Sequence, residues 1–186
     1  PFEMRTRHLL LSLVALLFMA ACGSSQKAQA PKTEAPKQGR ELTEEERINM
    51  QYMYVNALKE KMLGNYDKAG EFFAQCIRID GTNYAAMYEL AQIYRQNKKY
   101  SEALFFAESA SQGDPSNTWY RLFYADLLMD VRKLPEAEKQ FQKLYQDNPD
   151  RIEFGFSYAG TLLMNNKTQE AIKVYDDIES KTGINT

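Results

Sequence analysis

The chain has 186 residues, a length that suits one domain of ordinary size. Hydrophobic residues make up 44% and charged residues 26%, which is typical of a globular protein and not of a disordered chain. Without the two arginines and one glutamate that precede Cys22, 21 basic and 24 acidic side chains remain. This balance excludes a binder of nucleic-acid phosphates, which needs a basic surface. The only histidine, His8, also precedes Cys22, so the remaining chain has no imidazole for zinc or for a catalytic relay.

Residues 1–21 have the pattern of a secretory signal. Met4 is the expected start, Arg5 and Arg7 follow it, and an apolar run occupies residues 9–19 ahead of small residues. The run is too short to span a bilayer, which takes about 20 residues. We therefore expect residues 1–21 to direct export and to be removed.

Met19-Ala20-Ala21-Cys22 resembles the lipobox of bacterial lipoproteins, in which one hydrophobic and two small residues precede the lipidated cysteine. The resemblance implies that cleavage makes Cys22 the first residue and that Cys22 carries fatty acyl chains such as palmitate. A thioether there would also preclude a disulfide between Cys22 and Cys76. Each buried CH₂ contributes about 0.8 kcal/mol, so more than one chain is needed for stable anchoring.

Residues 22–42 form the expected linker between this anchor and the folded part. They are mostly Gly, Ser, Gln, Lys, Ala, Pro and Thr, and Pro31 and Pro36 interrupt any helix. We expect a flexible tether. By the same resemblance, Gly23 replaces the aspartate linked to inner-membrane retention, and no acidic run follows Cys22. The resemblance thus implies an outer-membrane anchor facing the periplasm of a Gram-negative, Bacteroidetes-like bacterium.

A period of 34 residues fills the segment 43–186. Alanines recur at this spacing in two columns, which are Ala57, Ala91, Ala125 and Ala159, and Ala69, Ala103, Ala137 and Ala171. Glycine and proline share a third column at Gly81, Pro115, Pro149 and Gly183. Several columns in one register indicate four structural repeats, at residues 50–83, 84–117, 118–151 and 152–185.

Each repeat is predicted to form two helices. In the second repeat, Met87, Leu90, Ala91 and Tyr94 follow the helical i, i+3, i+4, i+7 spacing, and a second apolar stripe begins at Ala103 after a polar break. The first helix of the chain is expected to start with a capping box at Thr43. Pro135 fits a first-turn position, and Pro115 ends the helix before it.

The alanine columns have a mechanical reason. Helix axes pack 8–10 Å apart, and a small residue at the crossing allows the closest approach. A large side chain there would overpack the contact by about 1–3 kcal/mol. We therefore expect the eight alanines to be structural positions.

The repeat resembles the tetratricopeptide repeat (TPR), which has a small residue at place eight, alanine at place twenty and proline at place thirty-two. Residues 84–117 are the closest copy, with Ala91, Tyr94, Ala103 and Pro115 at family places. The resemblance implies an all-α, right-handed superhelix of antiparallel hairpins. The chain stops at a repeat boundary without a polar capping helix, so we expect it to be truncated at its C-terminal end.

In this family, places two, five, nine, twelve and thirteen of the first helices face a concave groove, where place one is Met50, Tyr84, Thr118 or Ile152. The resemblance implies a largely aromatic and aliphatic groove that binds a protein or peptide partner. Its candidate residues are Tyr54, Leu58, Tyr88, Gln92, Arg95, Trp119, Leu122, Asp126 and Phe156. Tyr54, Tyr88 and Trp119 are the preferred hot spots. The alternative is that about half of these side chains simply pack between hairpins.

The expected function is a membrane-anchored adaptor without enzymatic activity, cofactor or metal, acting in envelope assembly. Cys76 is expected to be a buried, inert thiol, and no phosphate loop or metal-spacing cluster is apparent. Two alternatives stay open. One is a lipoprotein that binds glycans or other ligands, and the other is the N-terminal part of a longer protein with a functional domain downstream.

Overall fold

The computed structural model describes residues 41–183, which lie within one compact unit of residues 35–186. The helices of this part are α2 (Glu44–Met62), α3 (Tyr66–Ile79), α4 (Tyr84–Gln96), α5 (Tyr100–Gly113), α6 (Thr118–Asp130), α7 (Leu134–Asp147), α8 (Ile152–Met164) and α9 (Thr168–Thr182). Across residues 41–183 the regular elements are all helices. The signal segment, Cys22 and the linker up to residue 40 lie outside the described residues, as do residues 184–186.

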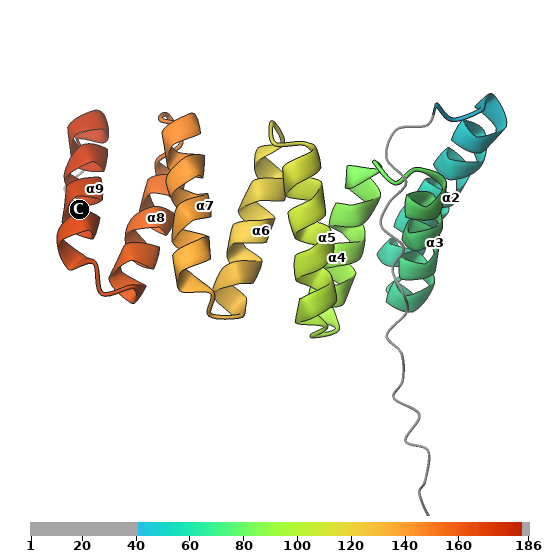
Figure 1. The fold of residues 1–186 in the computed structure, drawn as a ribbon, viewed down its shortest axis with the longest axis horizontal. Helices are drawn as coiled ribbons and strands as arrows, with labels where there is room; N and C mark the ends of the chain where they lie inside the picture. Colours follow the sequence, from blue (N-terminus) through green and yellow to red (C-terminus); the bar gives the residue numbers. More distant parts are fainter. Residues whose placement is uncertain (1–40, 184–186) are drawn as a thin grey trace, which may run out of the picture. The chain divides into compact units, whose positions relative to one another are not determined.

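The helices form four hairpins in chain order, each an antiparallel pair that packs on the next (Figure 1). The first helices α4, α6 and α8 start 34 residues apart, and so do the second helices α3, α5, α7 and α9. The expected all-α superhelix of hairpins is confirmed.

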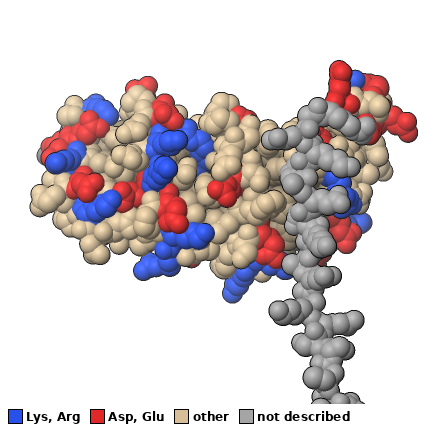
Figure 2. Space-filling view, in the orientation of Figure 1, with Lys and Arg blue, Asp and Glu red and all other residues tan. Residues whose placement is uncertain are grey.

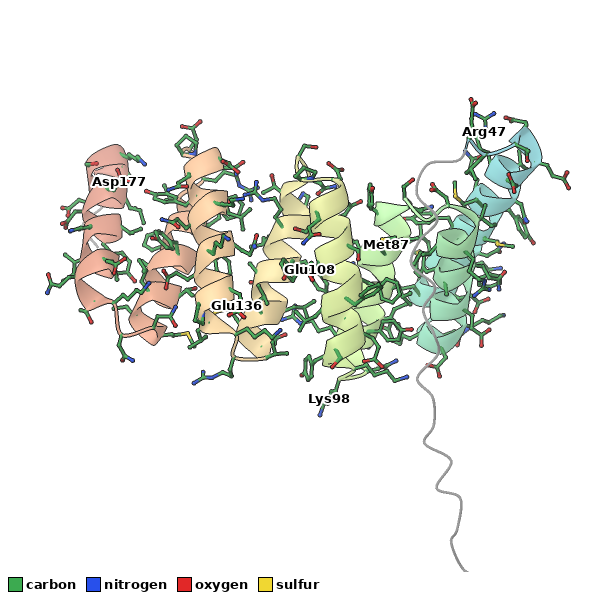
Figure 3. All side chains as sticks on the ribbon, in the orientation of Figure 1. Arg47, Met87, Lys98, Glu108, Glu136 and Asp177 are labelled. Atoms are coloured by element: carbon green, nitrogen blue, oxygen red, sulfur yellow. The ribbon has the colours of Figure 1, made fainter. Side chains whose placement is uncertain are left out.

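The turn inside every hairpin has the same backbone geometry. One residue per turn has a left-handed φ, at Gly64 (78°), Lys98 (58°), Arg132 (61°) and Asn166 (60°). The next N–H donates to the carbonyl five residues earlier, at 2.9 Å from Asn65 to Glu60 and 2.8 Å from Lys99 to Tyr94. This is the six-to-one bond of a Schellman motif, which satisfies the last carbonyls of a helix. Lys98 marks one of these turns in Figure 3.

The two alanine columns are at the centre of the packing. All eight alanines are fully buried, with exposed fractions of 0%. The buried residues around them form two hydrophobic clusters, one with Phe73, Met87 and Leu90 and the other with Phe141, Phe154 and Leu162. A methyl group at each crossing therefore lets the helices approach closely.

Helix starts follow the local sequence signals. Thr43 and Glu46 form a capping box, in which each side chain accepts the backbone N–H of the other residue. Pro135 lies in the first turn of α7, where its missing N–H would have no helical partner. The helix α5 ends at Gly113, just before Asp114-Pro115.

The outer face of α2 differs from the same face of the other first helices. Tyr52 is 68% exposed, whereas its counterpart Phe154 in the fourth repeat is 1% exposed. Ile48, Val55 and Met62 are exposed on the same helix. In the inner repeats this face packs against the second helix of the preceding hairpin, and among residues 41–183 no helix precedes α2.

Candidate functional site

The first helices α2, α4, α6 and α8 supply one side of the array, which we call the first-helix surface. It consists of places two, five, nine, twelve and thirteen of the four repeats. Lys61 at place twelve of the first repeat donates to Glu89 at 2.5 Å and to Gln92 at 3.4 Å, both in the second repeat. These contacts link neighbouring repeats through their polar side chains.

A second link joins the second and third repeats. The Nε atom of Arg95 lies 2.7 Å from Oδ2 of Asp130, and its guanidinium carbon lies 5.6 Å from the centre of the Phe123 ring. An arginine in this position combines an ion pair with a cation–π contact. Both cations of this surface therefore have partners within the protein.

A pocket of about 430 Å³ opens between these links. It is lined by Lys61, Tyr66, Gln92, Ile93, Arg95, Gln96, Tyr100 and Phe123. Three consecutive repeats contribute to it, with aromatic rings, amide groups and two cations. Four of the eight lining residues are polar or charged, so the pocket presents hydrogen-bonding groups beside aromatic surface.

Two of the expected hot spots are packed within the array. Tyr54 meets Phe73 edge-on at 5.5 Å between ring centres, and Tyr88 lies 5.0 Å from Tyr120 and 5.2 Å from Phe123. Burial, aided by the nearby Glu89 carboxylate, raises the pKa of Tyr54 to about 12 and also raises the pKa of Tyr88. Their rings thus stabilise contacts between helices.

Trp119 and Phe156 are the exposed aromatics among the candidates. Trp119 at the start of α6 is 61% exposed, and the Arg151 guanidinium lies 5.6 Å from its ring. Phe156 on α8 is 40% exposed and its ring lies 6.2 Å from that of Tyr175. These two side chains have the exposed area that a partner could cover.

The other candidates have intermediate exposure. Leu58 packs on the core of the first two hairpins and Leu122 on that of the last two. Gln92 and Arg95 line the pocket. Asp126 is half-buried on α6, and this burial raises the pKa of its carboxyl, while Arg95 opposes the rise.

The centre of this surface is more charged than the expected aromatic and aliphatic floor. Glu89, Phe123, Tyr66 and Tyr100 are pocket or network residues that were not among the candidates. One signal was available for the two tyrosines, because Tyr66 and Tyr100 are 34 residues apart and each begins a second helix. The position of Phe123 depends on how neighbouring repeats stack, and no single-repeat pattern reveals it.

Residues 41–183 offer no second type of site. This part contains no group of three or more His, Cys, Asp or Glu side chains placed to hold a metal ion. Cys76 is buried, and burial raises the pKa of its thiol to about 11. On the face visible in Figure 2, basic and acidic side chains are interspersed. No helix within these residues has both the length and the apolar character required to cross a membrane.

Comparisons with known proteins agree with the geometry. The TPR repeat-containing protein YpiA of Bacillus subtilis (strain 168) is 20% identical over 164 residues, which are 87% of this chain. The chain spans only 38% of the length of that curated relative.

Solved structures show the same fold. YrrB, described as a TPR protein with an unusual peptide-binding site, matches with a TM-score of 0.64 and 17% identity over 75% of this chain and 72% of its own. The first TPR domain of Spaghetti (RPAP3) bound to the HSP90 peptide SRMEEVD matches with a TM-score of 0.59 and 18% identity, over 69% of this chain and 99% of that domain.

Two family models match the sequence. The model described as anaphase-promoting complex, cyclosome, subunit 3 matches residues 50–144, about half of the chain, and a tetratricopeptide repeat model matches residues 125–183. The matched residues include the hairpin repeats and both alanine columns. Together with the TPR repeat-containing relative, these matches show that the chain belongs to the tetratricopeptide repeat proteins.

Proposed function

We propose that this protein is a non-enzymatic scaffold that binds a protein or peptide segment on its first-helix surface. The observation that carries the proposal is the pocket of about 430 Å³ to which three consecutive repeats contribute aromatic, amide and cationic side chains. Two structural neighbours support the proposal: YrrB is described as having a peptide-binding site, and the RPAP3 domain is described as bound to a peptide. An extended peptide or an amphipathic helix can span several repeats at once.

The proposal includes a place of action. Cys22 carries the lipid anchor, and residues 22–42 tether the array to the periplasmic side of an outer membrane, where it serves envelope assembly. The lipobox-like Met19-Ala20-Ala21-Cys22 sequence supports this part. Mass spectrometry of the protein from its native membrane should find acyl chains on Cys22, and Cys22→Ser should release the protein into the soluble fraction. An unmodified Cys22 would contradict the anchor alone.

The binding proposal is tested with a displayed peptide library selected on the purified full chain. Trp119→Ala should lower the affinity for the selected peptides by about tenfold, because exposed tryptophans often contribute much of the binding energy of an interface. Phe105→Ala is the matched control, since Phe105 is 44% exposed but lies on the second helix α5. Selection of no peptide, or equal loss from both variants, would count against the first-helix surface. Selective capture on a carbohydrate array would instead favour the ligand-binding alternative.

A further inference from the structure

The contacts between repeats follow a register. Place twelve of one repeat lies against place nine of the next. Lys61 contacts Gln92 in this way at 3.4 Å, and the charge of Arg95 acts on Asp126 one repeat later. The third such pair is Met129 and Gly160. The Met129 sulfur lies 3.7 Å from Oγ1 of Thr161, the residue after Gly160, which places this pair in the same register.

Gly160 leaves this third position without a side chain. A Cβ atom built at Gly160 would meet no atom within 4 Å, so the space above the backbone is open. Gly155 on the same helix is the opposite case, because its Cβ would lie 2.8 Å from Ile178 and from Tyr145. Packing therefore requires glycine at residue 155 and does not require it at residue 160.

Exposed apolar side chains flank the open position. Phe156 and Leu163 lie four residues before and three residues after Gly160, which puts all three on one face of α8. They are 40% and 43% exposed. Phe156 and Leu163 therefore flank an unfilled position on the surface of α8, where a large apolar side chain from a partner would have apolar neighbours.

An acidic group without a direct partner lies one repeat away, at the same place nine. Arg95 donates its hydrogen bond to Asp130 and not to Asp126. No residue of the described part donates a hydrogen bond to the half-buried Asp126 carboxylate. Partial burial and the nearby Asp130 carboxylate raise the pKa of Asp126, while the charge of Arg95 lowers it. A cationic group from a partner would complement this charge.

We infer that the third and fourth repeats select a peptide in which a lysine or arginine is adjacent or close in sequence to a large apolar residue. The apolar side chain covers Gly160 between Phe156 and Leu163, and the cation pairs with Asp126. This inference rests on the proposed peptide-binding function and specifies its ligand. An acidic peptide would instead meet Asp126 with like charge, while Lys61 and Arg95 are already paired with Glu89 and Asp130.

The test compares two substitutions at one residue. Gly160→Gln introduces at place nine the side chain that Gln92 has in the second repeat, and it should weaken peptide binding by about tenfold or more. Gly160→Ala adds only a methyl group and should leave binding within about twofold. Thermal unfolding should show both variants to be at least as stable as the parent, since neither fills occupied space.

The charge is tested with selected peptides and fluorescence anisotropy. Asp126→Asn should lower the affinity for a lysine-containing peptide by about tenfold. It should leave the affinity for the analogue with norleucine in place of lysine unchanged. Enrichment of acidic or neutral peptides, or equal effects of Asp126→Asn on both peptides, would overturn the inference. If Trp119→Ala weakens binding while Gly160→Gln does not, the proposed function stands and this ligand assignment fails. Sedimentation could instead show that the protein self-associates and that Gly160→Gln abolishes this association. A second copy of the chain would then be the occupant, and the inference would be overturned.

Discussion

At the scale of single residues, burial separates side chains that the sequence presents alike. Tyr54, Tyr88 and Phe156 are all aromatics at place five, yet the first two pack against neighbouring rings and the third is 40% exposed. The repeat pattern predicts the place but not the exposure, because exposure depends on which residue the next repeat supplies. Tyr88 meets Tyr120 and Phe123 of the third repeat, whereas the ring near Phe156 is Tyr175 of its own hairpin, at 6.2 Å.

Cys76 gives a pH-dependent prediction. Burial raises the pKa of its thiol from 9.0 to about 11, so the folded protein holds this proton more tightly than the unfolded chain does. The stabilising contribution is therefore fully present below pH 9 and is lost as the pH rises from about 9 to about 11. Unfolding midpoints measured from pH 7 to pH 11 should fall less steeply above pH 9 for Cys76→Ala than for the parent. Parallel pH profiles would contradict this assignment.

At the scale of helices and turns, the sequence predicts the elements well. The capping box at Thr43, the first-turn Pro135 and the break after Gln96 all lie where the local signals predict. The left-handed turn residues are less visible in the sequence, because only the first of the four turns uses glycine there. Lys98 and Arg132 adopt the same conformation, and the Schellman hydrogen bonds around them compensate for the steric cost.

The two glycines of α8 should respond in opposite directions when each is replaced by alanine, as measured by the free energy of unfolding. Gly155→Ala should lower the free energy of unfolding by about 1–3 kcal/mol, because its methyl group would overlap Ile178 and Tyr145 in the core. Gly160→Ala should raise it by about 0.5–1 kcal/mol, since alanine favours the helix and meets no neighbour. Urea denaturation of the two variants measures both effects, and shifts of the same sign would refute the packing described for α8.

At the scale of the whole array, the 34-residue period predicts the all-α class and the hairpin order without any long-range information. Contacts within one hairpin repeat with the sequence, so alanine columns and helix starts can be predicted from spacing. Contacts between hairpins depend on how they stack, and these create the pocket around Gln92 and Arg95. The candidate site could therefore be predicted as a surface, but its ion pairs and its open position at Gly160 could not.

The stacking of hairpins also predicts that truncating side chains at the same repeat place lowers the free energy of unfolding by unequal amounts. Phe154→Ala should lower the free energy of unfolding by about 3–5 kcal/mol, because Phe154 is 1% exposed within the core. Tyr52→Ala removes an aromatic ring at the same repeat place and should change it by less than about 0.5 kcal/mol, since Tyr52 is 68% exposed. Chemical denaturation compares them directly. A large loss from Tyr52→Ala would mean that another part of the protein covers this face of α2.

Within residues 41–183, the exposed face of α2 offers a place at which the array could be extended by engineering. Each inner first helix already shows how such a face accepts the second helix of an upstream hairpin, and α2 has apolar residues at Ile48, Tyr52 and Val55 to do the same. A duplicate of an internal repeat, fused ahead of Thr43, should dock there and add a nearest-neighbour interface of its own. Engineered versions of graded length could then act as molecular rulers whose melting temperatures rise with every added module.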